Sequence, residues 1–301
     1  MKPRRWGKFL LLGLLPLAAA VLVCAAPADK PAPAAFTVPE SAPAVLAPVG
    51  GNAPYDFARA VRFGETLTYS ARWNGFPIGF IHARVWPHPR ELNGRRVAML
   101  EVQIEGNDFL SLFYPVSATL KSYVDLQTGA SLLFRRRSTL GKERVDDRVW
   151  FQYDRKDALG QPEPLALLEE FNGELIGRSA VRRLPGAVCD SVALAWRLRE
   201  LPRTPDTVTP AVWFGNRYGS GQVAFRVGGK EKISLPNLGK FRCRWLHPQV
   251  AGDFAQAEVA KVEGICVENR TGTVMRAVGT LPIGRISIIL TRAKDSALNK
   301  K

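Results

Sequence analysis

The chain has 301 residues, 46% of them hydrophobic, and a formal net charge of +15. This length and apolar content suffice for a large core, in one domain or split into two lobes. The basic balance favours anionic partners such as lipid headgroups or anionic glycans. We expect no nucleic acid partner, because the cations are scattered and no motif of a nucleic-acid-binding module is present.

Residues 1–25 have the pattern of a secretory signal peptide. Four cations and no acid precede an apolar run over residues 9–26: Lys2, Arg4, Arg5 and Lys8. We expect cleavage after Ala25 or Ala28 and a periplasmic or otherwise exported mature protein, whose net charge would be about +11 without those cations. Two alternatives stay open. The run of about 18 residues is close to the spanning length and could be kept as a membrane anchor, and Cys24 could be lipidated.

The segment after the signal is compositionally distinct. Residues 26–54 hold seven of the 22 prolines and lack the periodicity of a helix or strand. We therefore predict a disordered Ala/Pro-rich spacer over residues 26–61. A β-rich domain is expected over residues 62–291, followed by a flexible basic tail over residues 292–301.

Strand-like alternation opens the folded part. Leu67, Tyr69 and Ala71 alternate with polar residues, which is the period-two pattern of a half-buried strand. Asn74-Gly75 follows, the strongest short-range hairpin signal. Residues 78–85 are its expected partner.

Further strands are predicted along most of the chain. They cover residues 97–105, 116–126, 132–138 and 144–153 and, later, short runs near residues 211–214, 222–227, 241–246, 258–267, 274–278 and 285–291. One helix is expected between the N-cap Asp190 and Pro202, after an irregular connection over residues 161–185. The predicted fold is mainly β: a curved antiparallel sheet or open barrel of about a dozen strands around one central helix.

Most catalytic templates are absent from the sequence. The histidines His82, His88 and His247 lack metal-ligand spacing, and there is no nucleophile elbow, P-loop or dinucleotide-binding fingerprint. We therefore assign no catalytic residue, metal or cofactor. A Ser-His-Asp site assembled in space is the alternative, and it would need one of these histidines beside a serine, aspartate or glutamate in a cleft.

Two features suggest ligand binding. In a strand, Arg135 and Arg137 share a face that Arg136 does not, and two adjacent arginines could grip a phosphate or carboxylate; the alternative is a solvated face paired with Asp146 and Glu143. Aromatic residues crowd the first hairpin and the strand predicted over residues 144–153. A curved sheet lined by them could hold an apolar ligand, although such residues are also common in cores. The candidate ligand-binding residues are Tyr69, Trp73, Phe80, Trp150, Arg135 and Arg137.

Three cysteines follow the signal segment, so at least one is a free or intermolecular thiol. Cys243 and Cys266 lie in successive strand-like runs, which antiparallel pairing could bring together. In an oxidising compartment they are the candidate disulfide. The open alternative is that these two and Cys189 are buried small apolar residues.

Several short motifs occur in a suggestive order. They are Phe63-Gly64-Glu65-Thr66-Leu67-Thr68-Tyr69 with Trp73 to Gly79, Ser122-Tyr123-Val124-Asp125 with Gly129, Asp190 to Arg199, and Ile283 to Leu290. Together they resemble the exported bacterial proteins catalogued as domain of unknown function 3108, over residues 62–291. The resemblance implies a β-rich periplasmic or envelope domain and brings no catalytic residues and no agreed activity.

The sequence thus favours a non-enzymatic envelope protein. We expect it to bind an apolar or anionic, lipid-like ligand or a partner protein, and to contact a membrane surface. Two alternatives are an envelope hydrolase with a spatially assembled site and a structural or assembly factor that acts through exposed sheet edges.

Overall fold

The computed structural model describes residues 57–161, 163–184, 187–201, 204, 206–208, 212–216, 219–252, 261–281, 284–296 and 298. The predicted signal peptide and most of the predicted spacer lie outside these residues. In the part of the chain that is described, no helix is both long enough and apolar enough to cross a bilayer.

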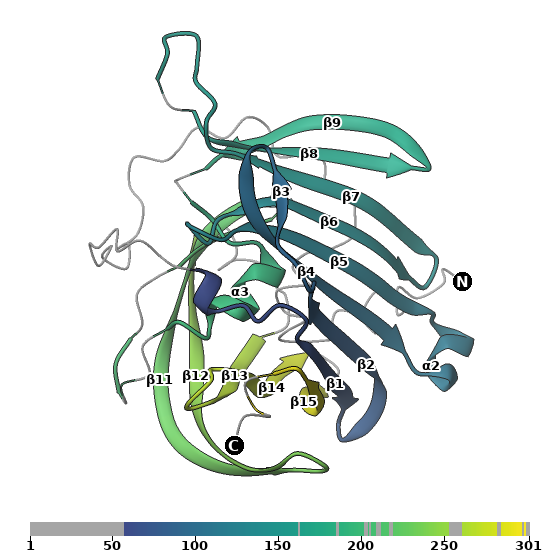
Figure 1. The fold of residues 1–301 in the computed structure, drawn as a ribbon. Helices are drawn as coiled ribbons and strands as arrows, with labels where there is room; N and C mark the ends of the chain where they lie inside the picture. The colour runs from purple at the N-terminus through teal and green to yellow at the C-terminus, as the bar shows by residue number, and fades with distance from the viewer. Residues whose placement is uncertain are drawn as a thin grey trace.

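Fifteen strands form one antiparallel sheet (Figure 1). They are β1 Thr66–Trp73, β2 Phe76–Val85, β3 Arg90–Leu92, β4 Arg95–Gly106, β5 Val116–Asp125, β6 Ser131–Leu140, β7 Glu143–Gln152, β8 Leu165–Asn172, β9 Glu174–Arg183, β10 Val212–Asn216, β11 Gly219–Leu235, β12 Gly239–Gly252, β13 Lys261–Glu268, β14 Val274–Leu281 and β15 Gly284–Lys294. Three short helices accompany them: η2 Phe57–Arg59, α2 Asp108–Phe113 and α3 Ser191–Arg197.

The strands follow one another in space almost as they do in sequence. The order is β10-β11-β12-β13-β14-β15-β1-β2-β4-β5-β6-β7-β8-β9, with β3 paired to β4 outside this path. The last strand pairs with the first, which joins the two halves of the chain, and β9 and β10 form the edges. The sheet curls around α3 (Figure 1), so the predicted curved sheet around one central helix is confirmed. Whether the edges serve assembly stays a prediction.

Local sequence explains the tight turns. Asn74 and Gly75 both have positive φ, 46° and 90°, as the predicted two-residue turn between β1 and β2 requires. Gly141, with φ of 62°, turns β6 into β7 as expected. A Cβ at Gly141 would lie 2.8 Å from the Tyr114 ring, so this turn also needs glycine for space.

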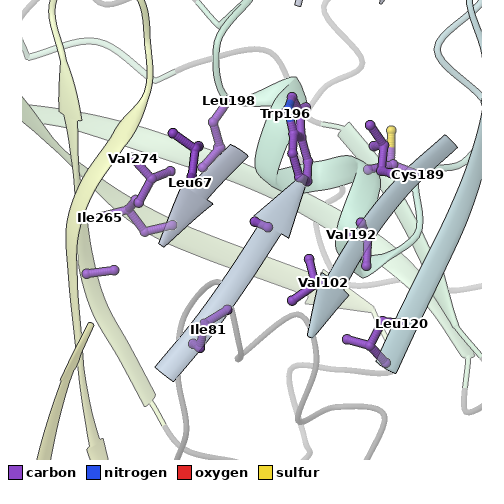
Figure 2. Close-up of a cluster of buried hydrophobic side chains, with 14 of the residues drawn as sticks. Leu67, Ile81, Val102, Leu120, Cys189, Val192, Trp196, Leu198, Ile265 and Val274 are labelled. Atoms are coloured by element: carbon purple, nitrogen blue, oxygen red, sulfur yellow. The ribbon is translucent and has the colours of Figure 1, made fainter. Parts of the chain in front are cut away.

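The core lies on the concave face, between the sheet and α3. Leu67, Ile81, Val102 and Leu120 come from four neighbouring strands and join Trp196 of α3 in one buried cluster (Figure 2). Because side chains alternate along a strand, the residues next to these in β2, β4 and β5 point to the convex face. The charged residues discussed below lie there.

The structure differs from the expected boundaries in three places. Residues 57–61 belong to the fold and not to a spacer, because Phe57 and Ala60 are buried in the core cluster. Strand β15 continues to Lys294, into the expected tail, because it pairs there with Thr66 of β1. The expected irregular connection over residues 161–185 contains the hairpin of β8 and β9.

Candidate functional site

Polar residues of the sequence motifs anchor α3 inside the sheet. Glu65, just before β1, forms a buried ion pair with Arg199, which follows α3, with 2.7 Å between Oε2 and Nη2. At the other end of the helix, the N-cap Asp190 accepts hydrogen bonds from the backbone N–H groups of Val192 and Ala193. Ser122 of β5 donates to the same carboxylate at 2.5 Å. These motif residues therefore position the helix.

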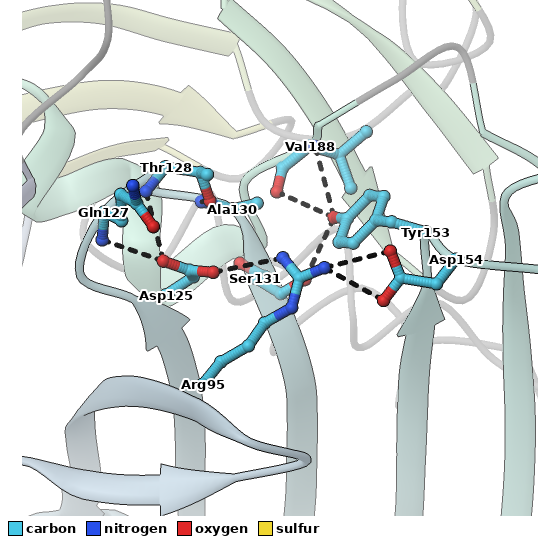
Figure 3. Close-up of polar contacts among 9 residues, drawn as sticks. All are labelled: Arg95, Asp125, Gln127, Thr128, Ala130, Ser131, Tyr153, Asp154 and Val188. Atoms are coloured by element: carbon cyan, nitrogen blue, oxygen red, sulfur yellow. Dashed lines mark hydrogen bonds and ion pairs between the residues drawn. The ribbon is translucent and has the colours of Figure 1, made fainter.

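A cluster of polar contacts ties the loops together at the end of the sheet where β5 connects to β6. We call this cluster, which centres on Arg95, the clasp. Arg95 of β4 pairs with Asp125 at 3.1 Å and with Asp154 at 2.9 Å (Figure 3). The hydroxyl of Tyr153 donates to the backbone carbonyls of Ser131 and Val188. Burial raises the pKa of Tyr153 above its ordinary value, so this hydroxyl stays protonated and serves as a donor. These contacts hold together the loops at this end of the sheet.

Two of the three histidines, His82 and His247, make polar contacts that the structure describes. Thr68 Oγ1 lies 3.3 Å from Nδ1 of His82, and Nδ1 of His247 lies 2.9 Å from the backbone carbonyl of Glu263. Neither contact supplies the side-chain carboxylate that orients a catalytic histidine. Within the described residues, no group of three His, Cys, Asp or Glu side chains could hold a metal ion.

A row of charged side chains crosses the convex face in register. The pairing of six neighbouring strands places one residue of each opposite the next: Glu101, Lys121, Arg135, Arg148, Glu169 and Arg178, from β4 to β9. Arg84 of β2 extends the row beyond Glu101. Strands are about 4.8 Å apart, so the three adjacent cations in its centre cover about 10 Å. We call Lys121, Arg135 and Arg148 the cation row.

Carboxylates on this face are outnumbered by cations. Each of three carboxylates pairs with two cations at distances of 2.5 to 4.0 Å: Glu101 with Arg84 and Lys121, Asp146 with Arg135 and Arg137, and Glu169 with Arg148 and Arg178. These six cations therefore exceed the three carboxylates by three positive charges, and every member of the cation row shares its carboxylate with another cation. Like charges directly opposite each other on a sheet are unfavourable, so an anion that bridges them would be stabilised.

Arg148 is the member of the cation row that is best positioned to bind an anion. Its guanidinium lies 4.3 Å from the centre of the Phe171 ring, a cation–π contact. Its Nε is buried and has no hydrogen-bond partner among the described residues. Its carboxylate neighbour Glu169 is engaged elsewhere, at 2.5 Å from Arg178 and 3.0 Å from Trp150 Nε1. Although burial opposes ionisation, these hydrogen bonds and the nearby arginines lower the pKa of Glu169.

The structure separates the sequence-predicted site residues into two groups. Tyr69 lies in the core, where its hydroxyl donates to the Val274 carbonyl, and Trp73 packs against the same core. Arg135, Arg137 and Trp150 lie together on the convex face, and Asp146 pairs with both arginines as the solvated-face alternative expected. Phe80 is also on that face, on β2, and is exposed.

Sequence reasoning missed Lys121 and Arg148 as partners of Arg135. Both side chains point away from the core, because side chains alternate along a strand and their neighbours Leu120 and Val149 are buried. That alternation was available from the sequence. The register that aligns Lys121 and Arg148 with Arg135 was not.

The candidate cysteines lie on neighbouring strands as predicted. Cys266 stands opposite Trp245, so Cys243 is its diagonal neighbour across β12 and β13. Both are fully buried free thiols, as is Cys189. The hydrogen bond that the Cys266 thiol donates to Cys243, together with burial, raises the pKa of Cys266. The structure brings the pair together, and the disulfide stays a prediction.

Comparison with known proteins identifies a family and no curated relative. The family model described as "Protein of unknown function (DUF3108)" matches residues 68–278, which confirms the resemblance seen in the sequence. No curated protein matches.

Two solved structures are similar to this chain. One is described as a β-barrel-like protein of the domain of unknown function DUF1849 from Brucella abortus, with 8% identity and a TM-score of 0.48 over 78% of this chain and 98% of that one. The other is a putative exported protein with a YmcC-like fold from Bacteroides fragilis, with 9% identity and a TM-score of 0.29 over 77% and 96% of the two chains.

Proposed function

Because the chain belongs to the DUF3108 family, which assigns it no activity, we propose a function from the convex face: the protein is a non-enzymatic, exported envelope protein that binds anionic lipid headgroups. The observation that carries this proposal is the cation row. Lys121, Arg135 and Arg148 stand directly opposite one another on three strands. A headgroup phosphate offers oxygens that arginine and lysine bind well.

The surroundings of the row support a lipid surface as the source of the phosphate. Trp150 and Tyr123 lie beside it on the same face, two residues further along their strands, and both are partly exposed. Aromatic rings with a polar edge are enriched where proteins meet the headgroup region of a membrane. The net charge of about +11 expected for the mature chain and the predicted signal peptide are consistent with this location.

Vesicle co-sedimentation tests the proposal. The mature protein should bind vesicles that contain phosphatidylglycerol and should bind pure phosphatidylcholine vesicles far more weakly. The cation-row variant, Lys121→Gln with Arg135→Gln and Arg148→Gln, should bind the anionic vesicles about a hundredfold more weakly, because each basic residue near such a surface contributes about 1 kcal/mol.

A matched control separates the row from net charge. The hairpin control variant, Lys230→Gln with Lys232→Gln and Lys240→Gln, removes the same charge from exposed positions on β11 and β12. It should keep most of the affinity. Equal losses in the two variants would mean that net charge, and not the cation row, determines binding.

A further inference from the structure

Exposed apolar side chains are distributed along one end of the sheet, from β2 to β9. Five of the nine large hydrophobic residues that are exposed in the described chain belong to this group: Phe76, Phe80, Leu112, Leu175 and Ile176. Phe76 begins β2 next to the first turn, Leu112 lies in α2, and the last two lie next to the turn between β8 and β9. We call this group the apolar rim.

Hydrogen bonds tie three of the connections at this end together. Asn107, next to α2, donates through Nδ2 to the Pro77 carbonyl at 2.8 Å. The backbone N–H of Gly141, in the turn between β6 and β7, donates to the Pro115 carbonyl at 2.8 Å. Antiparallel succession brings the β8–β9 turn to the same end. The connections that carry the rim therefore lie at one end of the sheet (Figure 1).

Because the apolar rim is exposed, we expect it to contact a partner. Phe76 is 73% exposed, Leu112 78% and Ile176 67%, although single exposed apolar residues elsewhere on a surface are ordinary. Water is a poor environment for such a group of side chains. The rim borders the convex face of β2 to β9, and Phe80 of β2 belongs to both. A bilayer offers an apolar layer for the rim and anionic headgroups for the adjacent cations.

We infer that the protein docks on a phospholipid bilayer with this end, so that the apolar rim enters the acyl region beneath the headgroups. This inference rests on the proposed function, since the cation row then lies over the same headgroups. It names the partner as a membrane surface and sets the orientation: the opposite end of the sheet, with the clasp of Arg95, faces away from the bilayer.

Site-directed fluorescence tests the orientation on the full mature chain. Leu112→Cys and Ile176→Cys carry an environment-sensitive nitrobenzoxadiazole label, and Leu159→Cys is the control. Leu159 is 84% exposed in the connection between β7 and β8, at the opposite end. The native thiols at 189, 243 and 266 are buried and should not take the label.

On phosphatidylglycerol vesicles with spin-labelled lipids, the labels at 112 and 176 should shift to the blue and be quenched, while the label at 159 stays in water. Phe76→Ser with Leu112→Ser should weaken binding about tenfold or more, and Leu159→Ser should not. Bound protein with all three labels in water, or with 159 quenched equally, would overturn the rim. If the rim of the cation-row variant inserts as it does in wild type, the proposed role of the cation row alone would be contradicted. Absence of binding would overturn both.

Discussion

Glu65 and Arg199 are 134 residues apart in the sequence and meet in a buried ion pair, 2.7 Å between Oε2 and Nη2. The pair joins the start of β1 to the end of α3. Arg199 also donates to the backbone carbonyl of Ala60. One arginine thus connects the helix to β1 and to the segment before it, which gives residues of both motifs a structural role.

Removal of one partner of this pair should be costly. Arg199→Met leaves the Glu65 carboxylate buried without its cation and should lower the free energy of unfolding by about 3–5 kcal/mol. The double variant with Glu65→Leu should regain most of that loss, because no charge is then buried. Urea denaturation of the three proteins measures the effect. A single variant that loses less than about 1 kcal/mol would contradict the proposed anchoring role.

Asp190 should make stability depend on pH. Burial raises its pKa, although hydrogen bonds from Ser122, Ala193, Ser131 and Val192 oppose the shift. The folded chain then holds this proton more tightly than the unfolded chain, whose aspartate pKa is about 3.9. The contribution of Asp190 to stability must therefore fall as the pH rises from that value through the folded pKa.

Asp190→Asn isolates this effect, because asparagine caps helices as well as aspartate does. The stability of this variant should not decline between acidic and neutral pH as that of wild type does. The variant should be at least as stable as wild type at pH 7. Asp190→Ala should lose about 1 kcal/mol through the missing cap. Thermal unfolding over a pH series gives both results, and parallel curves for wild type and Asp190→Asn would refute the assignment.

Substitution of Gly129 should lower the stability of the fold. Its φ is 69°, and a Cβ there would lie 2.2 Å from Nη1 of the buried Arg197. Gly129→Ala should cost about 1–3 kcal/mol or more, since backbone strain and displacement of Arg197 add. Gly94→Ala is the matched control, with φ of 71° and nothing within 4 Å of the added atom. Equal unfolding midpoints for the two variants would show that Arg197 moves without cost.

Alternation and turn chemistry were enough to predict much of the architecture. The first hairpin follows from alternating residues around Asn74-Gly75, and α3 follows from Asp190 as N-cap. The β8–β9 hairpin was missed, although Asn172-Gly173 is the same turn signal, because the flanking runs do not alternate cleanly. The cation row depends on register across many strands, which residue patterns within a single strand do not determine.

The three buried cysteines should be unreactive in the folded protein. Burial raises the pKa of Cys189 to about 12, and the thiolate is the reactive form. Titration with a chromogenic disulfide should therefore detect no thiol in the native mature chain. After unfolding, one thiol per chain would support the predicted bridge between Cys243 and Cys266, and three would show that all are reduced. Rapid reaction in native buffer would contradict the burial.

The salt dependence of vesicle binding tests the cation row most directly. Partitioning onto phosphatidylglycerol vesicles is measured over a series of sodium chloride concentrations for wild type, the cation-row variant and the hairpin control variant. Screening should weaken wild type and hairpin control steeply and in parallel, while the cation-row variant binds weakly with a shallow dependence. A cation-row variant that keeps the affinity and the steep salt dependence of wild type would contradict the proposal that Lys121, Arg135 and Arg148 bind anionic headgroups.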